Sequence, residues 1–156
     1  MSNKQFKIGY TQGTYDLFHI GHLNLLEHAK ELCDFLIVGI NSDELVKSYK
    51  NKNVHICAKD RARIVKALKV VDDVIITNTL DKIELYKKLN YDVIFIGNDW
   101  EGSQRWSETE KELSKFGVSV KYLPHTNGIS TTIISQQLNK KNWFYYTYKE
   151  KEWKKQ

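Results

Sequence analysis

The sequence predicts a three-layer α/β fold in which a doubly wound, parallel sheet of five strands lies between helices. Five short apolar runs rich in Ile, Val and Phe alternate along the chain with five amphipathic segments. Such alternation is typical of parallel sheets with right-handed crossovers. The runs are continuously apolar, as strands buried on both faces are. A length of 156 residues suits one such domain and is too short for two.

Each run and each amphipathic segment corresponds to one expected element. The strand candidates are, in chain order, Phe6–Thr11, Asp34–Asn41, Asp73–Thr77, Asp92–Gly97 and Val118–Leu123. The helix candidates are about Gly21–Leu32, Lys59–Val70, Leu80–Leu89, Ser107–Phe116 and Thr131–Lys140. In the first helix Leu25, Leu26 and Ala29 recur at helical spacing and would face the sheet. Residues Asn41–Lys59 show no clear period, so we expect a long loop there, and long loops are often functional.

The net charge of +5 is concentrated near the C-terminus. Residues 140–156 contain six lysines and two glutamates, whereas residues 1–139 carry 18 basic and 17 acidic side chains. A nucleic-acid-binding domain needs positive charge across its docking face, so we expect no nucleic-acid partner. We divide the chain into a folded domain, residues 1–140, and a basic, aromatic tail, residues 141–156. Rings beside lysines could stack on bases or lie on a membrane, but packing against the body or a partner is the simpler interpretation.

The chain also shows no signs of a membrane or secreted protein. No apolar run approaches the length of a membrane span, and the first residues lack a signal-peptide core. Cys33 and Cys57 lie in helix-like and loop-like contexts without metal-ligand spacing, which favours reduced thiols. We therefore expect no transmembrane segment and a cytoplasmic location.

The segment Gly13–His22, just after the first strand, is the most informative about chemistry. A turn opened by glycine leads into a helix, with His19 at the helix start and His22 on the first turn. Free N–H groups and the positive end of the helix dipole favour an anion such as phosphate there, and Gly21 allows close approach. The two imidazoles could donate hydrogen bonds to phosphate oxygens. The alternatives are a metal pair and two ordinary histidines at a helix start. Metal ligation usually needs a third ligand, and none stands nearby in sequence.

A second helix start near the end of the chain has the same character. Ser130 is a good N-cap, and with Thr131 and Thr132 it would present hydroxyl and N–H groups to an anion. Alone it would be an ordinary helix cap, but two helix starts that face one crevice suit a triphosphate. The expected loop adds Lys50 and Lys52, which composition alone would leave as solvated side chains.

Four motifs, in order between residues 8 and about 138, resemble those of one family. Gly13–His22 resembles the GT-aromatic-D-xx-HxGH motif of the cytidylyltransferase branch of the nucleotidyltransferase superfamily. Gly128–Thr132 is similar to the GIST[TS] element of these enzymes. Gly97–Gly102 and Val71–Ile75 are similar to the GDDWEG and VDEVI stretches of members specific for glycerol 3-phosphate. Adenylyltransferases and class I aminoacyl-tRNA synthetases carry close relatives of the HxGH core, whereas the longer form, with Gly13–Asp16 before it, is highly specific.

The resemblance implies a Rossmann-like catalytic domain over residues 1–140 that transfers CMP from CTP to a small phosphorylated alcohol, giving a CDP-alcohol and pyrophosphate. It also implies a homodimer and Mg²⁺ carried on the CTP phosphates, with no protein ligand for the metal readable in the sequence. The implied catalytic residues are His19, His22 and Lys52. The implied nucleotide-binding residues are Thr14, Tyr15, Gly21, Asn98, Asp99, His125, Gly128, Ser130, Thr131 and Thr132. The implied acceptor-binding residues are Lys50, Arg61 and Lys82, and the implied structural residues at the site are Gly13 and Asp16.

Several positions depart from the family pattern. Relatives read RTEGIST where this chain has His125, Thr126 and Asn127 before Gly128, so an imidazole replaces a forked, permanently charged guanidinium. Asn98 replaces the first Asp of GDDWEG but could still donate to and accept from a cytosine. Lys69 replaces a second Arg. These changes leave other acceptors open, namely phosphocholine, phosphoethanolamine or a phosphonate, as well as adenylyl transfer and a non-catalytic nucleotide-binding module.

Overall fold

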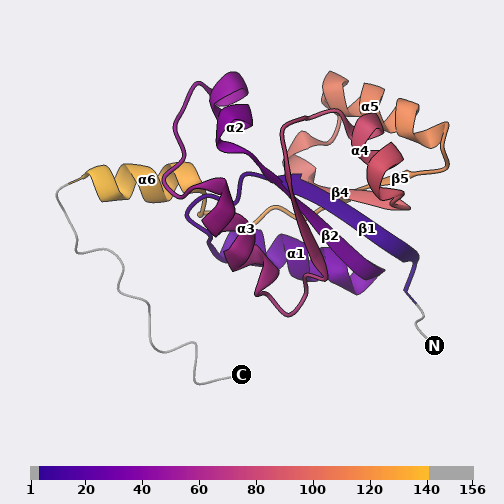
Figure 1. Ribbon diagram of the computed structural model, residues 1–156, viewed down its shortest axis with the longest axis horizontal. Coiled ribbons are helices and arrows are strands. Elements are labelled where there is room, and N and C mark those ends of the chain that lie inside the picture. The colour runs from indigo at the N-terminus through magenta and orange to yellow at the C-terminus, as the bar shows by residue number, and fades with distance from the viewer. Residues whose placement is uncertain (1–3, 141–156) are drawn as a thin grey trace.

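A parallel sheet of five strands forms the centre of the structure, a computed structural model that describes residues 4–140. The strands are β1 (Phe6–Gly13), β2 (Cys33–Asn41), β3 (Asp73–Thr77), β4 (Val93–Gly97) and β5 (Ser119–Leu123). Their order across the sheet is β3-β2-β1-β4-β5, and every neighbouring pair is parallel. The predicted α/β fold with a parallel five-stranded sheet is therefore confirmed (Figure 1).

Helices cover both faces of the sheet and give the predicted three layers (Figure 1). They are α1 (Ile20–Leu32), α2 (Asp43–Lys50), α3 (Ala58–Lys66), α4 (Lys82–Leu89), α5 (Gln104–Ser114) and α6 (Thr131–Asn139), with a short 3-10 helix, η1 (Asn98–Trp100). One core contains Leu26 of α1 and Val65 of α3, and the other contains Leu85 of α4 and Leu113 of α5. Within residues 4–140 no helix is long and apolar enough to cross a membrane. The expected tail, residues 141–156, lies outside the described residues.

The long loop expected over Asn41–Lys59 is wrong for its first half, which forms α2. The Oγ of Ser42 accepts a hydrogen bond from the backbone N–H of Leu45 and caps this helix. Two acidic residues follow in the first turn, where they complement the helix dipole, and Val46 is buried. Eight residues with one buried side chain are too few to show a helical period, although the cap itself was readable in the sequence.

Other boundaries shift by a few residues. The helix expected over Lys59–Val70 ends at Lys66, because the following segment forms turns closed by bonds such as Leu68 N–H to Val65 C=O. The helix expected from Ser107 begins at Gln104, since the Oγ of Ser103 caps it. Cys33 begins β2 rather than ending a helix, and both cysteines are free thiols.

The sheet also determines where a ligand can bind. The chain runs outward from β1 to β2 and β3 on one side and to β4 and β5 on the other. The crevice between β1 and β4 is thus the point at which the strand order switches, and ligands of such sheets bind there, beyond the carboxyl ends of the strands. Gly13 ends β1 and Gly97 ends β4, so the Gly13–His22 and Gly97–Gly102 motifs start on the two sides of this crevice.

Candidate active site

The two histidines of the HxGH motif cap helix α1 and hold each other in place. His19 is the N-cap, and its Nδ1 accepts a hydrogen bond from the backbone N–H of Gly21 at 3.1 Å. His22 is three residues later, and its Nδ1 accepts from the backbone N–H of His19 at 3.3 Å. The two rings stack with centroids 3.8 Å apart. This reciprocal pattern is a capping box built from imidazoles, and the predicted positions of both histidines are confirmed.

The capping bonds also determine which ring nitrogen can donate to a ligand. Because each Nδ1 accepts a hydrogen bond, the proton of the neutral ring lies on Nε2. Burial lowers the pKa of His22 to about 3, with the nearby His19 and Lys50 adding to the shift and Asp16 opposing it. Burial and the nearby His125 also lower the pKa of His19. At neutral pH the helix start therefore presents two neutral imidazoles, each with an Nε2–H donor.

The turn before α1 is tightly fixed. Tyr15 and Leu17 adopt left-handed backbone conformations, with φ of 54° and 48°, which are uncommon for such residues and typical of functional turns. A Cβ on Gly13 would lie 2.9 Å from the Tyr15 ring, so this position requires glycine. The Asp16 carboxylate accepts from the backbone N–H groups of His55 at 2.8 Å and Ile56 at 3.0 Å. The structure thus places Gly13 and Asp16 in structural positions.

Asp16 is ionised in this position. Burial alone would raise the pKa of its carboxyl, but hydrogen bonds from the backbone and ring of His55 and from the backbone of Ile56 outweigh burial and lower the pKa. The carboxylate therefore anchors the segment between α2 and α3 to the turn before α1.

Helix α6 begins on the other side of the same turn. Ser130 is its N-cap, with Oγ accepting from the backbone N–H of Ile133 at 3.1 Å. The Thr131 hydroxyl donates to the backbone C=O of Asp16 at 2.7 Å and fixes the helix start against the turn. Gly128 has a φ of 81°, which favours glycine, and does not line the adjacent cavity. The structure thus shows Gly128 shaping the turn before α6, and its nucleotide contact stays a prediction.

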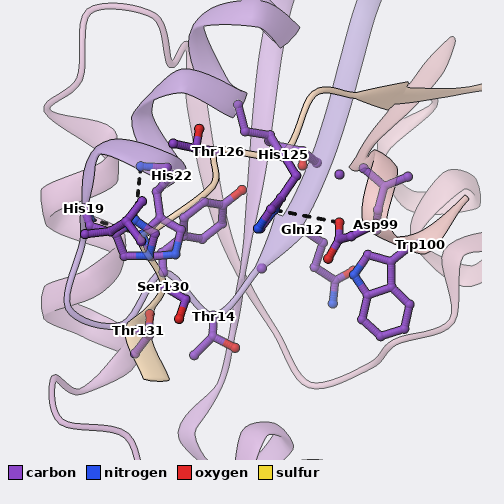
Figure 2. A pocket seen from close by; sticks show the side chains of 18 of the residues that line it. Gln12, Thr14, His19, His22, Asp99, Trp100, His125, Thr126, Ser130 and Thr131 are labelled. Atoms are coloured by element: carbon purple, nitrogen blue, oxygen red, sulfur yellow. Dashed lines mark hydrogen bonds and ion pairs between the residues drawn. The ribbon is translucent and has the colours of Figure 1, made fainter. Parts of the chain in front are cut away.

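A cavity of about 370 Å³ lies between the two helix starts and the carboxyl ends of β1 and β4 (Figure 2). A neighbouring cavity of about 390 Å³ shares part of its wall and is lined in addition by Lys52, His55 and Ser135. The structure brings most of the predicted site residues to the wall of the first cavity, namely Gly13, Thr14, Tyr15, His19, Gly21, His22, Lys50, Asp99, His125, Ser130, Thr131 and Thr132.

The two predicted lysines differ in the cavities that they line. Lys50 lines both cavities, and its Nζ donates to the Oγ1 of Thr14 at 3.3 Å. Lys52 lines only the second cavity, together with residues of α6. The two ammonium groups therefore extend the positive surface from the helix starts toward the segment between α2 and α3.

The wall opposite the histidines comes from β4, η1 and the segment after β5 (Figure 2). The Nδ1 of His125 lies 4.0 Å from the Oδ1 of Asp99. Asn98 does not line the cavity; its Oδ1 accepts from the backbone N–H of His125 at 3.2 Å and so positions that residue. The Trp100 indole lies beside Asp99 at this wall and is 47% exposed. Residue-by-residue reasoning did not select Trp100, although it stands inside the Gly97–Gly102 motif.

Arg61 is not brought to the wall of either cavity. It is 1% exposed, and its guanidinium donates to the backbone C=O groups of Thr14, Asn41 and Ile56. It also forms an ion pair with Asp43 at 2.6 Å. In this arrangement Arg61 cross-links the segments that carry the site, and its contact with an acceptor stays a prediction.

Lys82 does not line the first cavity and is connected to it through Gln12. Its Nζ donates to the Oε1 of Gln12 at 2.5 Å, and the Nε2 of Gln12 donates to Asn41 and to the C=O of Thr79. Gln12 lines the cavity at the end of β1, and nothing in the sequence marked it as a site residue. The structure therefore connects Lys82 to the cavity wall through Gln12, and its contact with an acceptor stays a prediction.

Burial of Lys82 predicts a pH-dependent stability. Burial, with a smaller contribution from Arg105 and an opposing one from Asp81, lowers the pKa of Lys82 from 10.5 to about 7. Between these values the unfolded chain binds more protons than the folded one, so the free energy of unfolding rises with pH. We expect this rise between pH 7 and pH 9, measured by urea denaturation, to be smaller in Lys82→Met. Lys87→Met, an exposed position on the same helix, should keep the wild-type dependence; equal slopes in all three proteins would contradict the shift.

No group of three His, Cys, Asp or Glu side chains within residues 4–140 is placed to hold a metal ion. Asp99 is the carboxylate on the wall of the first cavity. A cation carried on phosphate oxygens, as Mg²⁺ usually is, stays a prediction.

Comparison with known proteins agrees with this geometry. Residues 10–137 match the family model described as cytidylyltransferase-like. The chain is 40% identical over 129 residues to a glycerol-3-phosphate cytidylyltransferase of Bacillus spizizenii, covering 82% of this chain and 94% of the relative. It is 37% identical over 135 residues to an FAD synthase of Thermococcus onnurineus, covering 81% and 87%.

A solved structure shares the fold. A lipopolysaccharide core biosynthesis protein from Thermoplasma volcanium superposes with a TM-score of 0.65 at 24% identity, covering 78% of this chain and 97% of that protein. The family model and the relatives confirm the expected class, a nucleotidyltransferase enzyme. The chain belongs to the cytidylyltransferase-like family.

Proposed function

We propose that this protein transfers CMP from CTP to a small phosphorylated alcohol of the glycerol 3-phosphate type, releasing pyrophosphate. The observation that carries the proposal is the pair of helix N-termini, α1 and α6, that meet at one cavity at the switch point of the sheet. Each presents the positive end of a helix dipole to phosphate, α6 with its first backbone N–H groups and α1 with the Nε2–H groups of its two capping histidines. The relatives named glycerol-3-phosphate cytidylyltransferase support the choice of nucleotide and acceptor.

The reaction needs positioning rather than a protein base. A phosphate monoester has its second pKa near 6, so an acceptor oxygen is already largely anionic at neutral pH. That oxygen attacks the α-phosphorus of CTP, a new P–O bond forms, and the bond from the α-phosphorus to the oxygen of the β-phosphate breaks. Pyrophosphate leaves with the electron pair of that bond. The protein has to hold the two oxygens in line and stabilise the charge that develops.

The site residues divide this work by position. The Nε2–H groups of His22 and His19 would donate to oxygens of the α-phosphate and its neighbours. Lys52 and the start of α6 would hold the outgoing pyrophosphate, and Lys50 the incoming phosphate. Because the Thr131 hydroxyl already donates to Asp16, its contribution to a ligand would come from its backbone N–H.

The base and the metal complete the proposal. The wall formed by Asp99, Trp100 and His125 lies across the cavity from the histidines, and we assign it to the nucleoside. Mg²⁺ would enter on the phosphates of CTP and neutralise part of their charge. A homodimer stays a prediction of the resemblance, and a cytoplasmic location stays a prediction from the composition of the sequence.

Pyrophosphate release tests the proposal directly. We expect release with CTP and sn-glycerol 3-phosphate, and much weaker release with phosphocholine, phosphoethanolamine or 2-aminoethylphosphonate. Another acceptor that outperforms glycerol 3-phosphate would replace the proposed substrate. Protection from thermal unfolding by ATP and not by CTP would replace cytidylyl with adenylyl transfer, a comparison worth making because of the relative named FAD synthase. CTP binding without release from any acceptor would make the protein a nucleotide-binding module.

A further inference from the structure

Helix α6, whose start forms one side of the proposed anion site, is attached to the rest of the molecule mainly by polar contacts. None of its residues is buried. Within residues 4–140 two side-chain hydrogen bonds connect it to other segments: Thr131 Oγ1 to the C=O of Asp16 at 2.7 Å, and Ser135 Oγ with His55 Nε2 at 3.2 Å. Apolar burial usually fixes a helix in place, so here the polar contacts have an unusually large share in setting its position.

His55 uses both of its ring nitrogens to connect three segments. Its Nδ1 lies 2.9 Å from Asp16 Oδ2, and its Nε2 reaches Ser135 on the second turn of α6. Since Asp16 is an ionised acceptor, the proton between them belongs to Nδ1 of His55. The backbone N–H of His55 also donates to Asp16. We call His55 with its bonds to Asp16 and Ser135 the His55 bridge.

The His55 bridge spans the second cavity. Lys52 stands three residues before His55 in the segment between α2 and α3, and both residues line this cavity together with Thr131, Thr132 and Ser135. The imidazole of His55 therefore sets the distance between the segment that carries Lys52 and the start of α6. A phosphate group held between the Lys52 ammonium and the α6 amides would depend on that distance.

We propose that His55 is a positioning residue that raises the affinity of the site for the β- and γ-phosphates of the nucleotide, and for the pyrophosphate derived from them. The inference rests on the proposed function, because it assumes that the second cavity receives the outgoing phosphates. His55 itself touches protein at both nitrogens and is not a catalytic residue. Its effect is confined to ligands that reach beyond the α-phosphate.

Two variants remove the same contact from opposite sides. His55→Asn keeps a donor near the position of Nδ1 for Asp16 but is too short to reach Ser135, and Ser135→Ala removes the hydroxyl. We expect each to weaken CTP and pyrophosphate binding about fivefold in calorimetric titrations, the fold-change that one net hydrogen bond corresponds to. CMP binding should change less than twofold. The double variant should be no weaker than either single variant, because both lose one shared interaction.

A control variant and the pattern of ligand binding distinguish failure of this inference from failure of the proposed function. Ser114→Ala removes an exposed helical serine on α5, remote from the cavities, and should leave all three ligands unaffected. Equal weakening of CMP and CTP, no weakening of CTP, or additive losses in the double variant would each overturn the role of His55. Failure of the wild-type protein to bind CTP would instead overturn the proposed function.

Discussion

Replacing His22 with alanine is expected to lower the rate of pyrophosphate release at least a hundredfold while leaving CTP binding nearly unchanged. The loss corresponds to about 3 kcal/mol of transition-state stabilisation, typical of removing one donor that faces a developing charge. His22 is neutral at pH 7 because burial lowers its pKa to about 3, so the missing group is an Nε2–H donor rather than a charge. The rate should therefore show no titration of this ring above about pH 5.

Single-turnover release and CTP titration together measure this effect. His22→Gln should recover part of the rate, because its amide can still donate near the position of Nε2. His28→Ala, on the same helix but away from the cavity wall, serves as the matched control and should keep the wild-type rate. A His22→Ala protein that turns over almost normally would remove His22 from its assigned role.

Replacing Arg61 with methionine should destabilise the fold by about 3 kcal/mol or more. The change leaves three backbone carbonyls without their donor, each at a cost of about 1 kcal/mol or more, and it also removes the ion pair with the partly exposed Asp43. Methionine retains much of the apolar volume, so the loss reports mainly on the hydrogen bonds. Urea denaturation at pH 7 gives the free energy of unfolding.

Arg63→Met is the matched control, since Arg63 lies two residues later on the same helix and is exposed. It should change stability by only a few tenths of a kcal/mol. If Arg61→Met instead left stability intact and raised the KM of the acceptor alone, Arg61 would be an acceptor ligand, as the resemblance implies, and the cross-link would be of little energetic importance.

The contrast between His22 and Arg61 shows which positions in the site can be predicted from the sequence and which cannot. The continuously apolar runs in the sequence were enough to predict the parallel sheet. The two histidines, three residues apart at a helix start, could also be placed correctly, because helix capping depends on neighbouring residues. The position of Arg61 could not be predicted in this way. Its hydrogen-bond partners come from segments up to 47 residues away in sequence, and only the folded chain brings their carbonyl groups together. Helix α2 was overlooked because its signal is a cap and one buried valine, not a period.

Gln12 and Trp100 illustrate a second limit. Gln12 ends up at the cavity because β1 ends there, and its orientation follows from Lys82, Asn41 and Thr79, which no local pattern relates to it. Trp100 follows a strand whose position next to β1 depends on the sheet order. Residues within a local motif could be assigned to the site from the sequence. Residues that reach the site only because of the order of the strands could be identified only from the structure.

The absence of buried side chains in α6 has an energetic consequence for any nucleotide that touches both helix starts. Such a ligand connects α6 to α1, so part of its intrinsic binding free energy is spent on holding that helix in place, and the measured affinity is what is left. By mass action the same ligand makes the docked helix more stable. The substrate is in this sense a structural component of the site that binds it.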